Sequence, residues 1–143
     1  MALFVVRKLV RSQMFGLWRR RTFEDPQLGR FTRVRTMWYP AETADGLQVS
    51  LEGSKDRPSP ESIEMARKLL EDPSGLIRVA EAFVRANSHA KEYIEGNGEL
   101  VCDGFTVYES GKFTVDFSLA KWPDAMITVP FKDGAPCDVV LDD

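Results

Sequence analysis

The run Phe113-Thr114-Val115-Asp116-Phe117-Ser118-Leu119 alternates apolar and polar side chains at every step. Successive side chains of a β-strand point to opposite faces of its sheet, so this period of two predicts a strand with four apolar residues facing a core. Asp116 alternates with those residues, and we expect it to lie on a solvated strand face or in a cleft.

Similar strand patterns lie on both sides of a helical region. The Asp25-Pro26-Gln27-Leu28-Gly29 stretch predicts a hairpin turn, and Asp45-Gly46 and Asp133-Gly134 predict further turns. Trp122 to Ala125 is also expected to be a turn, and Pro130 should place its strand at a sheet edge or a bulge. The predicted strands are residues 23–24, 30–39, 47–51, 100–108, 113–119, 126–131 and 137–141.

Two helices are predicted between these strands. Ser59 followed by Pro60 is typical of a capped helix start, and the Asp72 to Gly75 stretch ends this first helix. Apolar residues at spacings of three and four then continue to about Glu95, which predicts one longer second helix.

The order of elements is three strands, two helices and four strands, without alternation of strand and helix. This order is typical of an α+β protein with an antiparallel sheet that has one face covered by the helices. A length of 143 residues suits one core. We therefore expect a single α+β domain at residues 22–143, preceded by an arm at residues 1–21.

Charge is divided unevenly between these two parts. Residues 1–21 contain six basic residues and no acidic one, and the rest of the chain contains 13 basic and 22 acidic residues, a net charge of -9. An acidic body repels nucleic acid phosphates, so we predict no nucleic acid partner.

The arm, residues 1–21, has the pattern of an amphipathic basic helix. Its apolar residues at helical spacing are Leu3, Val6, Val10, Met14 and Leu17. Basic residues interrupt every apolar run of the arm. The arm therefore has the pattern of neither a secretory signal nor a membrane-spanning helix. The pattern suits a helix on a membrane surface and equally a helix docked on the domain or on a partner. Met14 also has the context of a natural start, in which case residues 1–13 do not belong to the native protein.

The sequence lacks several common catalytic motifs. Phosphate-binding glycine loops, nucleophile elbows and zinc helices are absent, and His89 is the only histidine, so we predict no cofactor and no metal. Asp138, Asp142 and Asp143 lack the spacing of a calcium loop. Asp116 with Glu109 is the local candidate for an acid and base pair.

The cysteines favour a reducing compartment. Cys102 and Cys137 do not make a disulfide framework, and each lies in a strand-like stretch that suits a reduced thiol. Together with the absence of a signal or spanning segment, this favours a cytoplasmic protein.

Five residues are candidates for contact with a partner. Arg33 and Arg35 alternate along one predicted strand, on the face opposite to Val34 and Trp38, and suit either a carboxylate or phosphate ligand or cross-strand acidic neighbours. Trp38, Tyr39 and Trp122 suit core packing or aromatic contact with a partner.

The stretch MFGLWRRRTFEDPQLGRF resembles a bacterial group of small domains of unknown function, some of which occur near toxin and immunity genes. These begin with a basic, aromatic leader, then F-x-D-P-x-L-G-x-F and a strand carrying tryptophan. The resemblance covers mainly residues 14–53 and extends faintly to Asp133-Gly134. Trp38-Tyr39-Pro40 stands where the group has Trp-x-Gly. No catalytic or binding residues are carried over from the group.

These observations lead to hypotheses from different classes of protein. The first is a non-enzymatic binding module, of immunity or adaptor type, that meets a basic partner through an acidic sheet face and exposed aromatic residues. The second is a small enzyme or ligand-binding domain in which acidic residues converge with His89 or a thiol. The third is a peripheral membrane protein attached through residues 1–21. The sequence favours the first hypothesis because known catalytic motifs are absent.

Overall fold

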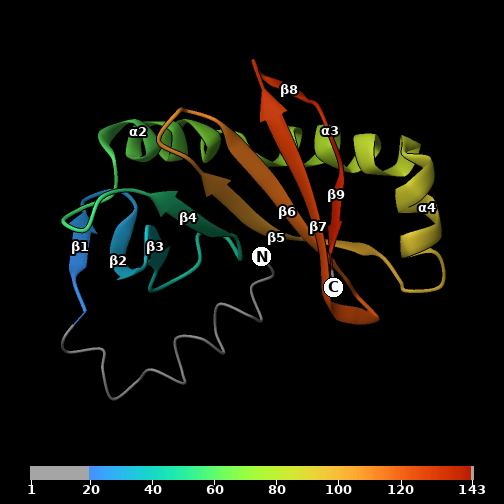
Figure 1. Ribbon diagram of the computed structural model, residues 1–143, viewed down its shortest axis with the longest axis horizontal. Coiled ribbons are helices and arrows are strands. Elements are labelled where there is room, and N and C mark those ends of the chain that lie inside the picture. Colours follow the sequence, from blue (N-terminus) through green and yellow to red (C-terminus); the bar gives the residue numbers. More distant parts are fainter. Residues whose placement is uncertain (1–19, 143) are drawn as a thin grey trace.

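The computed structural model describes residues 20–142, which form one nine-stranded sheet and three helices (Figure 1). This composition confirms the α+β class. The strands are β1 Thr22–Asp25, β2 Gly29–Val34, β3 Met37–Pro40, β4 Gln48–Glu52, β5 Leu100–Val107, β6 Phe113–Leu119, β7 Trp122–Lys132, β8 Ala135–Pro136 and β9 Val140–Asp142. The helices are α2 Pro60–Leu69, α3 Pro73–Ala86 and α4 Ser88–Ile94.

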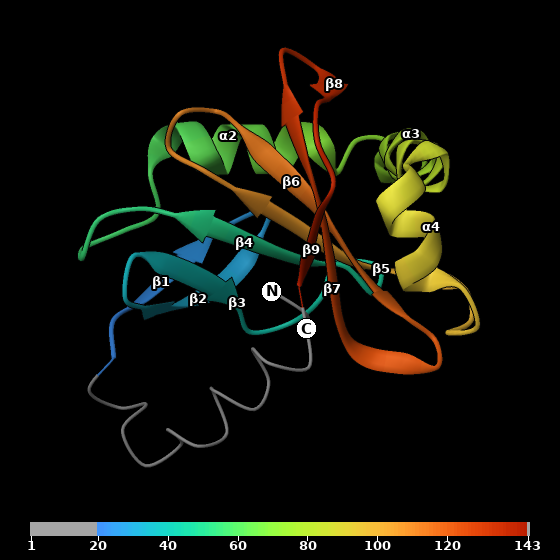
Figure 2. The ribbon, with the colours of Figure 1, turned by 45° about the vertical axis from the view of Figure 1, so that its right-hand side comes forward.

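Strand neighbours follow the chain order from β1 to β8, and β9 pairs with β7. The expectation of a fully antiparallel sheet is wrong in one place, because β4 and β5 pair in parallel. The three helices lie between these two strands in the chain and allow it to return to the same end of the sheet, as a parallel pair requires. In Figure 1, α2 and α3 run behind the sheet, and Figure 2 shows α3 and α4 together on one side.

Local turn chemistry explains the first half of the sheet. The predicted hairpin at Pro26 to Gly29 is confirmed by the pairing of β1 with β2. The single strand predicted for residues 30–39 is wrong, because a two-residue turn at Arg35-Thr36 divides it into β2 and β3. Arg35 has a φ of 60°, which is a left-handed conformation. Glycine is the usual residue in this conformation, so an arginine here does not indicate a turn in the sequence.

The second predicted helix is also divided. Asn87 has a ψ of 122°, which ends α3, and its side-chain oxygen accepts a hydrogen bond of 3.0 Å from the Ala90 N–H, which starts α4. Asparagine is well suited to this capping role. The helical region therefore contains three helices where two were expected.

The last strands differ from the prediction at their ends. Trp122 to Ala125 belongs to β7, and the chain turns at Ala120-Lys121 instead. Pro130 lies in β7 between the segments that pair with β8 and with β9, so the hydrogen-bond donor that proline lacks is not needed there. Cys137 lies outside the strands.

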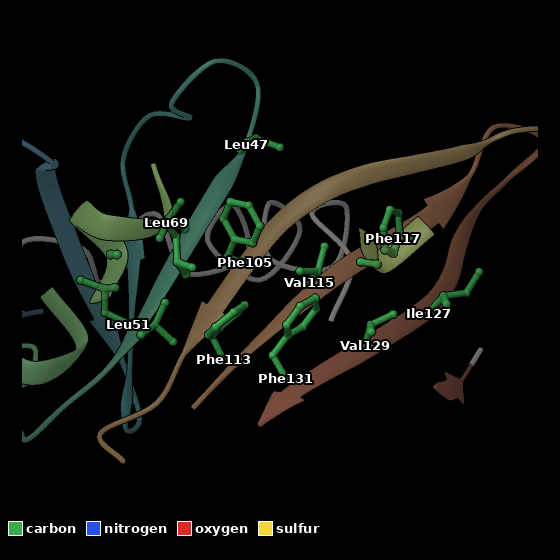
Figure 3. Packing of buried hydrophobic residues seen from close by; sticks show 14 of the residues in the cluster. Leu47, Leu51, Leu69, Phe105, Phe113, Val115, Phe117, Ile127, Val129 and Phe131 are labelled. Carbon is green, nitrogen blue, oxygen red and sulfur yellow. The ribbon is translucent and has the colours of Figure 1, made fainter. Parts of the chain in front are cut away.

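The core lies between the sheet and the helices. β6 contributes Phe113, Val115, Phe117 and Leu119, as the alternation predicted, and Figure 3 shows the first three beside the core residues of β5 and β7. The buried apolar residues of all three helices belong to the same cluster. The intervening side chains of the central strands point to the other side of the sheet, which we call the polar face. Its members are Ser50, Asp103, Thr106, Thr114, Asp116 and Ser118.

A buried carboxylate joins the first hairpin to α2. One oxygen of Asp25 accepts hydrogen bonds from the Gln27 and Leu28 N–H groups at 3.0 and 2.8 Å. The other accepts from Arg67 Nη2 at 2.5 Å. Burial alone acts to raise the pKa of Asp25, but these donors outweigh it and hold that pKa below its usual value.

Replacing Asp25 by alanine is expected to lower the free energy of unfolding by about 2 kcal/mol or more at pH 7, because three donors lose their acceptor. A carboxyl with a lowered native pKa stabilises the fold above its unfolded pKa, and this contribution disappears as pH falls through the lower native value. Urea unfolding of Asp25→Ala at pH 7 measures the loss, and the difference in free energy of unfolding between the parent and Asp25→Asn should become smaller as the pH is lowered from 7 to 3. A constant difference across this range would contradict the proposed role of the charge.

None of the helices within residues 20–142 is long and apolar enough to cross a membrane. The first 19 residues of the predicted arm, with the amphipathic helix expected there, lie outside the described residues. The described part begins with Arg20 and Arg21, and the Arg21 carbonyl accepts a 3.1 Å hydrogen bond from the Arg33 N–H at the start of β1.

Candidate functional site

The centre of the polar face holds a buried carboxylate. Asp116 lies on β6, and its side chain is enclosed by the hydroxyl groups of Thr106 and Thr114, which donate hydrogen bonds of 2.7 and 2.8 Å. Only 6% of Asp116 is exposed, so the expectation of a solvated strand face is wrong. Its two hydrogen-bond donors come from neighbouring strands, β5 and β6, and a sequence pattern of alternating polarity does not reveal these contacts.

A second carboxylate lies at an irregularity in the next strand. The β5–β6 register shifts between Cys102 and Gly104, which leaves Asp103 as an extra residue on β5. One Asp103 oxygen accepts a 3.0 Å hydrogen bond from the Ser118 hydroxyl. The other oxygen, Oδ2, is buried and has no hydrogen-bond donor among residues 20–142.

These two carboxylates influence each other electrostatically. Burial and the negative charge of Asp116 raise the pKa of Asp103 to about 6, although the Ser118 hydroxyl acts in the opposite direction. Burial also raises the pKa of Asp116 against the effect of its two threonine donors. Neither carboxylate forms an ion pair with a basic side chain within the described part of the chain. The polar face is therefore a place where positive charge is favourable.

The residues that an acid and base mechanism requires are placed apart. His89 is exposed on α4, on the helical side of the sheet, and Asp116 lies on the polar face. Cys102 pairs with Phe117 and so points to the core side. Glu109, the other half of the predicted local pair, is exposed in the turn after β5, and its N–H donates to Glu52 at 2.9 Å.

Both cysteines are free thiols. Burial raises the pKa of Cys102 to about 12, with nearby carboxylates adding to the effect, so its thiol is not ionised at neutral pH. Cys137 is exposed, and its sulfur lies 3.4 Å from the Pro130 carbonyl oxygen. Cys137 is therefore the accessible thiol of the pair.

A pocket of about 360 Å³ lies at the end of the polar face, between the β5–β6 turn and the start of β8. We call it the Tyr108 pocket. Phe113 and Phe131 are among its lining residues, but their stacked rings, 4.8 Å apart, belong to the core cluster of Figure 3 and are only 8% and 2% exposed. The other lining residues are Glu52, Tyr108, Ser110, Lys112, Thr114, Pro130, Lys132 and Cys137.

A wider hollow of about 570 Å³ lies between the β1–β2 turn and the loop after β3. It is lined mainly by exposed residues, including Glu24 of β1, Arg30 of β2 and Glu42 of the loop after β3. Arg30 is already paired with Glu24 at 2.7 Å. The lining of this hollow is more polar than that of the Tyr108 pocket.

The five residues predicted as partner contacts do not form one surface. Trp38 is fully buried in the core, which removes it from any surface. Arg33 is its cross-strand neighbour and therefore lies on the same side of the sheet, not on the opposite side as expected. Arg35 is exposed in the β2–β3 turn, Tyr39 is half-buried, and Trp122 is half-buried against Tyr93 with ring centroids 4.9 Å apart.

Sequence reasoning missed the Tyr108 pocket. Tyr108 and Lys112 flank a predicted turn, and Lys132 follows the last core residue of β7. Aromatic and basic residues beside turns were a usable signal, but the register that brings Phe113 opposite Phe131 was not visible.

Among residues 20–142, no group of three or more histidine, cysteine, aspartate and glutamate side chains could hold a metal ion. Asp138 and Asp142, two members of the acidic C-terminal set, lie within this range, and Asp143 lies outside it.

The chain matches no protein-family model, no curated protein and no solved structure. Its chemistry must therefore be inferred from its own residues.

Proposed function

We propose that the protein is a non-enzymatic protein-binding module, of immunity or adaptor type, that holds an apolar and acidic segment of its partner in the Tyr108 pocket. The observation that carries this proposal is a pocket lined by the exposed Tyr108 ring and by Pro130, and flanked by two lysines that form no ion pair within the described residues.

The apolar part of the pocket is suited to an apolar side chain. Thr114 and Pro130 line it and lie opposite each other in the β6–β7 ladder, so their positions are fixed by backbone pairing before a partner arrives. Tyr108 at the rim is 36% exposed. Burial of one large apolar side chain contributes about 1.5 to 3 kcal/mol, and a preformed pocket loses little of this to ordering.

The rim determines the charge of the partner. Lys112 and Lys132 are both exposed, whereas Glu52 already accepts a hydrogen bond from the Glu109 N–H. We therefore propose an acidic segment for this pocket, although the net charge of the whole body suggested a basic partner. Local charge decides contact chemistry, and net charge acts mainly at long range.

The alternative hypotheses have less support. An enzyme of the predicted kind needs His89 or a reactive thiol beside the carboxylates, and these residues lie on different sides of the sheet. Attachment to a membrane surface depends on residues 1–21, of which only Arg20 and Arg21 are described.

The proposal predicts a defined peptide preference. The full chain is used to select binders from a random peptide library displayed on phage, and selected peptides are then titrated by fluorescence anisotropy. We expect an apolar residue flanked by Asp or Glu, and a loss of affinity of about tenfold or more for Lys112→Glu/Lys132→Glu, which reverses the charge of the rim. Lys55→Glu/Lys121→Glu makes the same charge change at exposed positions away from the pocket.

Maleimide labelling of Cys137 provides a second measurement, because this thiol lines the pocket and Cys102 is not ionised. A selected peptide should slow the labelling. Failure to select any peptide, equal binding by both lysine variants, or unchanged labelling would each argue against the proposal.

A further inference from the structure

The two carboxylates of the polar face form no ion pair with a basic side chain within the described part of the chain. Asp103 Oδ2 is buried without a hydrogen-bond donor, and the neighbouring Asp116 carries a second carboxylate that also lacks a basic partner there. Buried carboxylates without a compensating cation are costly. A cationic segment placed over this face would reduce that cost.

The chain itself carries such a segment. Residues 1–19 contain Arg7, Lys8, Arg11 and Arg19, begin with an α-amino group and include no acidic residue. Their apolar residues fall at helical spacing, so the predicted helix has one apolar and one basic side. This charge is complementary to that of the polar face.

The segment is long enough to reach the two carboxylates. It joins the body just before β1, which lies four strands away from β5 and five strands away from β6 in the sheet. Neighbouring strands are about 4.8 Å apart, so the distances across the sheet to Asp103 on β5 and Asp116 on β6 are about 19 and about 24 Å. A helix of 19 residues is about 28 Å long.

The route across the sheet also provides apolar contacts. Val34, Met37 and Tyr39 lie on the same side of the sheet as Ser50, because Trp38 pairs with Leu51 on the core side. All three are half-buried and lie on the strands between β1 and β4. They are positioned to receive the apolar side of the segment before its basic residues reach β5.

We propose that residues 1–19 dock on the polar face of their own chain, with their apolar side over β2 and β3 and their positive charge at Asp103 and Asp116. This docking is independent of the Tyr108 pocket proposal, since it concerns a segment of the same chain and a different part of the sheet.

Hydrogen exchange of the full chain, followed by mass spectrometry, tests the proposal. We expect the amides of residues 5–17 to exchange about tenfold or more slowly than in an unstructured peptide of the same sequence. Arg7→Glu/Lys8→Glu/Arg11→Glu should abolish this protection. Asp103→Asn, which keeps the shape of the side chain, should reduce it. The matched controls are Lys55→Glu/Lys91→Glu/Lys121→Glu and Asp124→Asn, at exposed positions outside the polar face.

Several results would overturn the proposal. These are free exchange of residues 5–17 in the parent, and protection that is unchanged in both the basic-segment variant and Asp103→Asn. Protection that appears only with vesicles containing phosphatidylserine would instead indicate a membrane-surface segment. Protection that increases with protein concentration would indicate docking between copies. A thermal melt of each variant verifies that the body remains folded.

Discussion

Replacing Gly104 by alanine is expected to lower the free energy of unfolding by about 3 kcal/mol or more. A Cβ atom at this position would lie 1.8 Å from the Gln48 carbonyl oxygen and 2.6 Å from the Gln48 nitrogen. These are backbone atoms, so no side-chain rotation relieves the clash. Gly104 also has a φ of 151°, which a residue with a side chain rarely adopts.

The effect is large because of what the close approach holds together. Gln48 and Gly104 are paired in the parallel β4–β5 ladder, which joins the first four strands to the rest of the sheet. Moving these strands apart would also separate Val49 from Phe105, two buried core residues in the same ladder. The clash therefore affects the junction between the two halves of the molecule.

Gly111→Ala is the matched control. Gly111 has a φ of 79°, and a Cβ there would meet nothing within 4 Å, so only the backbone strain applies, about 1 kcal/mol. Urea unfolding of both variants, followed by tryptophan fluorescence and circular dichroism, measures the difference. Similar losses for the two variants would mean that β4 and β5 separate at little cost.

Elements set by local rules were predictable from the sequence. The alternation in residues 113–119 predicts β6 with the bounds that the structure has, and turn residues predict the β1–β2 hairpin. The parallel β4–β5 pair was not predictable, because its partners are separated by the whole helical region and strand patterns do not encode direction. The Arg35 turn was missed because its left-handed residue is neither glycine nor asparagine.

The candidate site was predictable only in part. The sequence identifies Asp116 as a polar residue between core residues, but its hydrogen bonds come from hydroxyl groups on β5 and β6, and the Thr106 hydroxyl is brought there by the strand register. Asp103 is an extra residue on β5 because the strand register shifts between Cys102 and Gly104. The only indication of this shift in the sequence is the glycine that follows Asp103. Sites assembled across strands require pairing information, which a single sequence does not contain.

Trp38→Ala is expected to lower the free energy of unfolding by about 3 to 5 kcal/mol, the usual range when a buried tryptophan is removed. Trp38 is 0% exposed, and its indole N–H donates a 3.0 Å hydrogen bond to the Ser54 carbonyl oxygen. The Phe23 ring meets it edge-on, with centroids 6.5 Å apart. Thermal and urea unfolding measure the loss.

Two other substitutions separate the contributions of Trp38. Trp38→Phe keeps an aromatic ring in the core but removes the indole N–H, so it should cost less than Trp38→Ala. Trp122→Ala is the surface comparison, because Trp122 is half-buried against Tyr93 and should cost about 1 to 2 kcal/mol.

The same variants test whether tryptophan contributes to binding. Because Trp38 is buried and does not line the Tyr108 pocket, Trp38→Ala should bind a selected peptide as the parent does, at a temperature where it remains folded. Loss of stability together with unchanged affinity would assign Trp38 to the core alone. Normal stability with lost affinity would instead place Trp38 at an interface and contradict the packing described for it.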